Sequence, residues 1–113
     1  MRASIFVALT AVAAMPVFAE PVLSIPLPLT EESNVIPAEY DCPDSGKVSV
    51  SYINAGENSL AIISADDMDR VFVNVISASG ARYVSGEYEW WSKGDKATFT
   101  NLTEEDSAQE CIS

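Results

Sequence analysis

Two glutamates, Glu87 and Glu89, are the residues of this chain that could supply acid–base chemistry to a hydrolase. Hydrolysis of a glycoside needs a pair of carboxyl groups. Their spacing of two would place both on one face of a strand, where charged side chains ordinarily meet solvent. The chain has no histidine, which removes the usual general base and the Ser-His and Cys-His arrangements. We therefore expect a binding protein without a cofactor rather than an enzyme, with a weak hydrolase as a minor alternative.

The other groups that could hold a metal ion fit one poorly. The run Asp66, Asp67 and Asp69 offers oxygens, but it lacks the spaced ligands of a calcium loop and is typical of an acidic turn. Two cysteines without histidine make a poor zinc site, because structural zinc takes four ligands. An even number of cysteines in an exported chain instead predicts a disulfide between Cys42 and Cys111.

The segment from residue 77 to residue 94 has the composition of a binding surface. Small residues at 77–81 allow a tight, protruding loop. Lys93 stands before Gly94 at the expected end of a strand, where a lysine does not pack into a core. It is either a binding residue or a solvated turn lysine.

Three aromatic residues, Tyr88, Trp90 and Trp91, make up the strand between these two features. Tyr and Trp are prominent in binding hot spots. Tyr88 and Trp90 share a face of the strand, and we expect that face to fill the interior of the domain.

The first 19 residues have the pattern of a signal peptide. Arg2 gives a positive start, an apolar run covers 5–15, and Val17 and Ala19 occupy the positions where small residues precede the cut. The run is shorter than the roughly 20 residues that a membrane span needs. No cysteine stands at the cut, so we expect a soluble, exported protein without a membrane anchor.

The chain is strongly acidic, with a formal net charge of −11. Loss of Arg2 with the signal peptide leaves five basic residues against all 17 acidic ones, a net charge of −12. Such a surface repels nucleic acid and anionic membranes and attracts basic proteins. The alternative is that this negative charge only keeps the protein soluble and attracts no particular partner.

The pattern of the sequence predicts that these residues are carried by an all-β domain. From Tyr40 onward apolar and polar residues alternate with the period of a strand, and Val71, Val73 and Val75 share one face. Roughly eight short strands joined by hairpin turns indicate a small antiparallel barrel or sandwich. The clearest candidates are 47–54, 59–64, 69–77, 82–84, 87–91, 97–102 and 109–112.

We divide the chain into the signal peptide (1–19), a proline-rich extension (20–37) and the β domain (38–113). Four prolines in the extension exclude a helix there. Ile25, Leu27 and Leu29 alternate, so part of the extension is either an edge strand or a flexible lead.

From Tyr40 to Cys111 the chain resembles the family of C-type lysozyme inhibitors, whose members are periplasmic or membrane-bound. Two stretches at the right separation make the resemblance specific. The matching features are Cys42, the Val-Ser-Tyr strand at 50–52, Ser-Leu-Ala at 59–61, Ser-Ala-Ser-Gly-Ala-Arg-Tyr at 77–83, Trp-Trp-Ser-Lys-Gly at 90–94 and Cys111.

The resemblance implies an eight-stranded antiparallel β-barrel, closed here by one disulfide, that inhibits animal-type lysozyme. In the family a loop serine and a lysine enter the active-site cleft of the enzyme, and they correspond to Ser79 and Lys93. The full set that the resemblance assigns to lysozyme binding is Ser79, Gly80, Arg82, Tyr83, Lys93 and Gly94.

The implied partner is a basic C-type lysozyme, and the implied location is the periplasm, where the inhibitor would protect the bacterial cell wall. A homodimer is left open. The alternative function is a periplasmic module that binds a small ligand or glycan in a pocket lined by Tyr88, Trp90 and Trp91.

Overall fold

The computed structural model describes residues 21, 23, 24, 26, 27, 30 and 32–113. The expected signal peptide lies outside this part of the chain, as do Ile25 and Leu29 of the extension. The expectation for 1–19 therefore stays a prediction.

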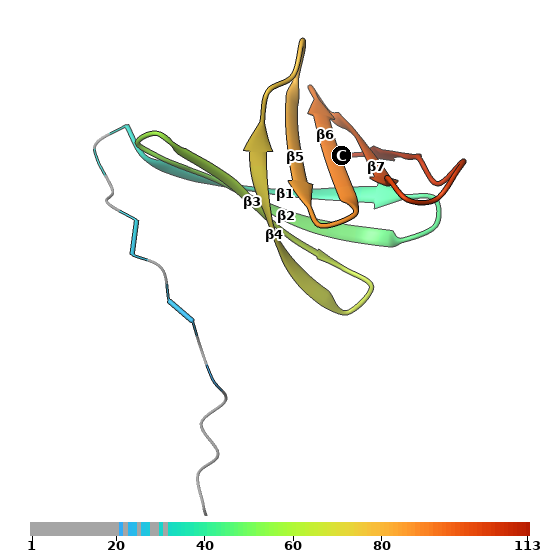
Figure 1. The fold of residues 1–113 in the computed structure, drawn as a ribbon, viewed down its shortest axis with the longest axis horizontal. Helices are drawn as coiled ribbons and strands as arrows, with labels where there is room; N and C mark the ends of the chain where they lie inside the picture. The colour runs from blue at the N-terminus through green and yellow to red at the C-terminus, as the bar shows by residue number, and fades with distance from the viewer. Residues whose placement is uncertain (1–20, 22, 25, 28–29, 31) are drawn as a thin grey trace, which may run out of the picture.

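Eight strands form a closed barrel in which each strand pairs with its neighbours in sequence and β1 pairs with β8 (Figure 1). All pairs are antiparallel, and the described residues contain no helix. The predicted all-β, eight-stranded barrel is confirmed. The strands are β1 (Asn34–Cys42), β2 (Gly46–Ala55), β3 (Asn58–Ala65), β4 (Met68–Val75), β5 (Ala81–Ser85), β6 (Tyr88–Lys93), β7 (Lys96–Asn101) and β8 (Gln109–Ile112).

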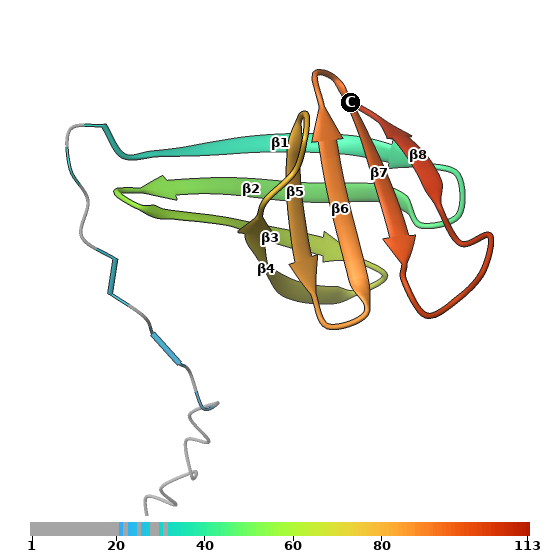
Figure 2. The ribbon, with the colours of Figure 1, turned by 45° about the horizontal axis from the view of Figure 1, so that its top comes forward.

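Strand β1 begins at Asn34, inside the segment 20–37 that we predict to be a proline-rich extension. It pairs with β2 from Asn34 onward, in the register Pro37↔Ser51. A proline has no N–H to donate, so it fits a strand that has a partner on one side only. Pro37 lies in such a stretch, because β1 meets β8 only at Asp41↔Ile112. The first part of β1 therefore has a partner on one side, and β1 and β2 reach beyond β5 and β6 (Figure 2).

The core is built from alternate residues of the strands and is rich in aromatic rings. Trp90 is fully buried and meets Tyr40 and Phe99 edge-on, with ring centroids 4.9 and 5.7 Å apart. Tyr88 is half-buried and packs against the same cluster. The expectation that Tyr88 and Trp90 face the interior is confirmed.

A hydrogen-bonded chain of aromatic residues crosses this core. Trp90 Nε1 donates to the Tyr52 hydroxyl at 2.9 Å, and the Tyr52 and Tyr40 hydroxyls lie 2.8 Å apart. Burial, followed by the hydrogen bond with Tyr52, raises the pKa of Tyr40 well above its usual range. The polar atoms of these large side chains are thus satisfied inside the barrel.

The valines of β4 share one face, as their spacing indicates, but that face lies outside the barrel. Val71 and Val73 are 56% and 51% exposed, whereas Phe72 between them is buried. One large aromatic residue fills the interior at this strand, so the alternating valines form part of the outer surface.

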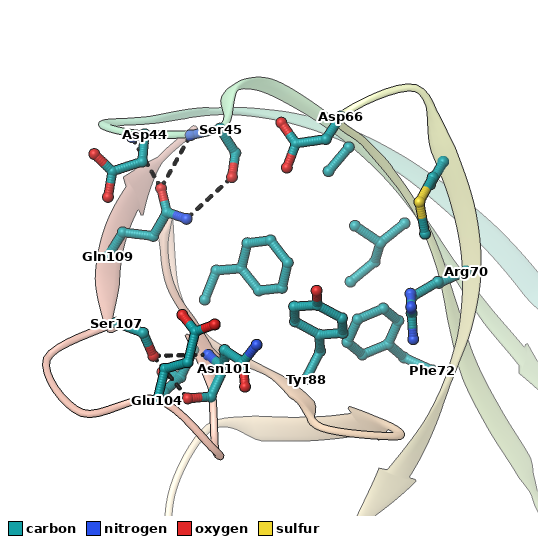
Figure 3. A pocket seen from close by; sticks show the side chains of 15 residues that line it. Asp44, Ser45, Asp66, Arg70, Phe72, Tyr88, Asn101, Glu104, Ser107 and Gln109 are labelled. Carbon is teal, nitrogen blue, oxygen red and sulfur yellow. Dashed lines mark hydrogen bonds between the residues drawn. The ribbon is translucent and has the colours of Figure 1, made fainter.

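The hairpin turns divide between the two ends of the barrel. We call the end with residues 76–80 and 94–95 the loop end, and the end with residues 43–45, 66–67, 86–87 and 102–108 the cavity end; the remaining turn, residues 56–57, joins β2 to β3. The cavity end opens into a hollow of about 360 Å³ (Figure 3). Asp66 and Asp67 form a plain hairpin turn there, both with positive φ, as a two-residue turn of this hand requires.

The predicted disulfide between Cys42 and Cys111 is present and spans 69 positions of sequence. It joins β1 to β8, where the backbone ladder is a single register pair. Both cysteines are buried in the core. The bond therefore closes the barrel covalently where its hydrogen bonding is weakest.

Replacing both Cys42 and Cys111 with Ala should lower the free energy of unfolding by about 4 kcal/mol, because a loop of this length is no longer closed in the unfolded chain. Urea denaturation followed by tryptophan fluorescence measures the change. A loss below about 1 kcal/mol would show that the β1–β8 ladder closes the barrel without the disulfide.

Candidate functional site

The candidate site lies at the loop end, where the β4–β5 loop packs against the end of β6. Ala81 is paired with Ser92 in antiparallel strands, so the residues just before Ala81 lie beside the residue just after Ser92. Ser79 and Lys93 therefore come from segments 14 positions apart but meet at the same edge of the barrel. Both are exposed.

Gly80 makes this close approach of the two segments feasible. Its φ is +66°, and a Cβ added there would collide with the carbonyl oxygen of Ser92 and lie 2.6 Å from Lys93 Cγ. A side chain would push the loop away from β6 as well as strain the backbone. Glycine thus fixes the distance between the loop and Lys93.

Trp91 joins the parts of the site on the outer face of the barrel. Its Nε1 donates a hydrogen bond to the Ser79 carbonyl oxygen at 2.8 Å. Its ring lies under two cations, with Lys93 Nζ 4.9 Å and Arg82 Cζ 5.9 Å from the centroid. One indole therefore anchors the loop backbone and positions the Lys93 ammonium.

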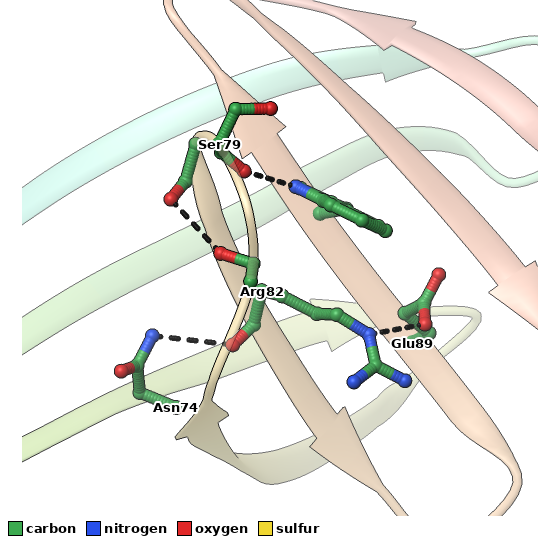
Figure 4. A network of polar contacts seen from close by, with 7 residues as sticks. Asn74, Ser79, Arg82 and Glu89 are labelled. Carbon is green, nitrogen blue, oxygen red and sulfur yellow. Dashed lines mark hydrogen bonds and ion pairs between the residues drawn. The ribbon is translucent and has the colours of Figure 1, made fainter.

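Further hydrogen bonds hold the loop in place (Figure 4). Ser77 Oγ donates to the Gly80 carbonyl at 3.2 Å, and Asn74 Nδ2 donates to the Arg82 carbonyl at 3.1 Å. Arg82 Nε lies 2.6 Å from the Glu89 carboxylate. The loop is therefore shaped before any partner arrives, which lowers the entropic cost of binding.

The loop end carries basic residues together with acidic ones, among them Asp95 of the 94–95 turn. Arg82, Lys93 and Lys96 are three of the five basic residues that follow position 19. Arg82 is paired with Glu89 and Lys96 with Glu110. Within the described part of the chain, Lys93 has no carboxylate at ion-pair distance. Its ammonium is available to a carboxylate of a partner.

Five of the six predicted site residues lie in or beside this surface, and one does not. Ser79, Gly80, Lys93 and Gly94 are exposed, and Arg82 is half-buried beside them. Tyr83 is 5% exposed and packs inside the barrel against Tyr52, with centroids 5.6 Å apart. It lies on the opposite face of β5 from Arg82 and supports the core rather than the binding surface.

Trp91 belongs to this site but is not among the six residues that the sequence predicts for it. Its signal was available: Trp91 alternates with the interior residue Trp90, shares a face with Lys93 two positions later, and pairs with Arg82. The outer face of β6 could therefore have been identified as the support of the site.

The alternative readings fit this geometry less well. Tyr88, Trp90 and Trp91 do not line a common pocket, because Trp90 is in the core and Trp91 is outside. Glu87 lies in the β5–β6 turn, and Glu89 is held by Arg82, so the two do not form an isolated carboxylate pair.

The fold and the paired loops define a small β-barrel that presents a hydrogen-bonded loop beside an exposed lysine. Comparison with known proteins identifies the class: residues 40–108 match the family described as membrane-bound lysozyme-inhibitor of c-type lysozyme. The chain belongs to this family.

No helix among the described residues is long and apolar enough to cross a membrane.

Two curated relatives are described as membrane-bound lysozyme inhibitors of C-type lysozyme. One, from Pseudomonas aeruginosa, is 51% identical over 61 residues, covering 53% of this chain and 48% of that protein. The other, from Cupriavidus necator, is 37% identical over 73 residues, covering 65% of this chain and 58% of that protein. The aligned region thus spans about half the length of these relatives.

A solved structure extends the similarity to the whole barrel. The crystal structure of Pseudomonas aeruginosa MliC in complex with hen egg white lysozyme superposes with a TM-score of 0.69 at 37% identity. The match covers 83% of this chain and 97% of that one.

The close approach at Gly80 can be tested with two alanine variants. Gly80→Ala should cost about 2 kcal/mol more stability than Gly46→Ala, because both strain a positive φ but Gly46 has open space around it. Urea denaturation of both variants gives the difference. Equal losses would mean that the loop does not depend on contact with Ser92 and Lys93.

Proposed function

We propose that this protein inhibits C-type lysozyme by inserting the Ser79 loop and the Lys93 turn into the active-site cleft. The observation that carries the proposal is the exposed Lys93 ammonium held beside Ser79 by the Trp91 indole. The family membership and the complex of MliC with hen egg white lysozyme support the choice of partner.

The chemistry of the enzyme explains how such a tip would act. C-type lysozyme needs one protonated carboxyl group as the acid and one ionised carboxylate. A lysine ammonium between them pairs with the ionised group and lowers the pKa of the acid, which favours loss of the proton that catalysis needs. The Ser79 hydroxyl can hydrogen-bond either form. The loop also occupies the space of the sugar.

The charge distribution suits the same partner. Under this proposal Lys93 faces the carboxyl groups of the cleft, while the acidic surface of the protein attracts a basic enzyme and raises the rate of encounter. Under this proposal the protein acts stoichiometrically and has no catalytic residues.

We further propose that residues 1–19 are removed on export and that the domain acts in the periplasm, where it would shield the cell wall from host lysozyme. The signal-peptide pattern and the absence of a cysteine at the cut support a form without a lipid anchor. The curated relatives are described as membrane-bound. Fractionation of the expressing cell therefore tests whether this protein is found with the membranes or in the periplasmic fraction.

The inhibitory role predicts a specific dependence on Lys93. The wild-type protein should suppress lysis of cell walls by hen egg white lysozyme near equimolar ratio. Lys93→Ala should raise the inhibition constant by about 30-fold, the equivalent of the 2 kcal/mol typical of a hot-spot residue. Turbidity of a cell-wall suspension measures both quantities.

Lys96→Ala is the matched control, because Lys96 lies across the same turn and is already paired with Glu110. We expect it to change the inhibition constant by less than about threefold, as exposed ion pairs contribute little. Equal effects of the two variants would show that Lys93 contributes only its positive charge and makes no specific contact in the cleft. Full lysis at several-fold excess of wild-type protein would refute the proposal.

The homodimer left open by the sequence would have a surface to use. Val35, Ile53, Leu60 and Val73 are consecutive cross-strand partners and form an uncharged row on the outer face. A second copy can pack there without bringing like charges together. We expect a dimer in sedimentation equilibrium that Val73→Lys converts to a monomer; a monomeric wild type would exclude it.

A further inference from the structure

The cavity end carries a second candidate binding site, far from the Ser79 and Lys93 tip and unrelated to lysozyme inhibition. Its hollow of about 360 Å³ lies in the size range of sites for small molecules. The turns that surround it belong to the other set of hairpins, so a ligand there and a partner at the loop end would not compete.

The floor of the cavity is apolar. Ile63 and Phe72 are almost fully buried beneath it, and Phe99 packs between Phe72 and Tyr88, with ring centroids 6.5 and 5.7 Å away. A bound molecule would therefore lay a hydrophobic body of modest size against aromatic rings.

One wall of the cavity carries a cation. Arg70 faces inward from β4, and its guanidinium lies 4.6 Å from the centroid of the Tyr88 ring. Neither of the ion pairs between described residues involves Arg70. An inward-facing guanidinium without a carboxylate in ion-pair contact is ready to receive an anionic group.

The opposite side of the opening carries acidic groups. Asp44 and Glu104 lie across the cavity from Arg70, and a third carboxylate, Asp66, also lines the cavity (Figure 3). Among the described residues, none of these carboxylates is in ion-pair contact with Arg70.

The rim of the cavity is braced before anything binds. Gln109 Oε1 accepts hydrogen bonds from the backbone N–H groups of Asp44 and Ser45 at 3.0 and 3.2 Å, and its Nε2 donates to Ser45 Oγ at 3.0 Å. Ser107 Oγ accepts from the Asn101 N–H and donates to the Asn101 carbonyl. These bonds tie two turns to the strands, which favours a preformed site.

We infer that this cavity binds a small zwitterion with an apolar body, such as a short peptide. Its carboxylate would meet Arg70, and its ammonium would meet Asp44 and Glu104. A simple anion would be repelled by the acidic rim and the overall charge of the protein. A simple cation with the same apolar body would remove water from the Arg70 guanidinium without pairing it with an anion. Its binding would therefore be weak, because desolvation of an unpaired charge is costly.

Three probes with the same apolar body separate the contributions of the charges: alanylphenylalanine, its N-acetyl derivative and its C-terminal amide. Isothermal titration gives the affinities, and NMR shifts of residues 44–45, 66–70 and 101–109 locate the site. We expect the free dipeptide to bind about tenfold more tightly than either derivative, the worth of one charged hydrogen bond.

Variants assign each charge to a wall. Arg70→Gln should erase the preference over the amide, and Glu104→Gln should reduce the preference over the N-acetyl derivative because Asp44 remains. Arg70→Lys should retain most of the binding. Lys96→Gln removes the same charge at the loop end and should leave binding unchanged. Near-UV circular dichroism of the aromatic side chains shows whether each variant is folded.

No binding, equal binding of the three probes, or a preference that survives Arg70→Gln in a folded protein would each overturn the inference. None of these outcomes depends on lysozyme, so the failure of this inference and the failure of the inhibitory function are observed in separate experiments.

Discussion

Closure of the barrel between β1 and β8 is the constraint on which the rest of the structure depends. The two strands meet at one register pair, Asp41↔Ile112, next to the Cys42–Cys111 disulfide. A sheet of this size that stayed open would expose the aromatic core and two unpaired edges. The covalent link lets β8 be only four residues long and leaves the start of β1 free to extend beyond the barrel.

Closure also fixes which residues face in and which face out, and the binding surface follows from that division. Trp90 and Trp91 are adjacent, yet one completes the core and the other supports the tip. The interior indole holds β6 against Tyr40 and Tyr52. Because β6 is held from within, the exterior indole can place Ser79 and Lys93 with little freedom of its own.

Much of this architecture could be predicted from the sequence, because a period of two and the turn residues locate strands without reference to the fold. The same period states which residues share a face but not which face is inside. The period alone therefore does not place the valines of β4, and the family resemblance assigns Tyr83 to the binding surface although it lies in the core. The start of β1 was missed because prolines obscure an edge strand.

The role of Trp91 depends on contacts between segments far apart in the chain, and such contacts do not follow from local pattern. Its ring is useful because cross-strand pairing brings Arg82 beside it and the loop brings the Ser79 carbonyl over its edge. The same reasoning applies to the cavity end, where the Arg70 guanidinium lies over the Tyr88 ring. In both places an aromatic ring holds a cation on a protein that is otherwise acidic. A cation held in this way keeps its charge without an internal carboxylate, so each end of the barrel can offer it to a negatively charged group from outside.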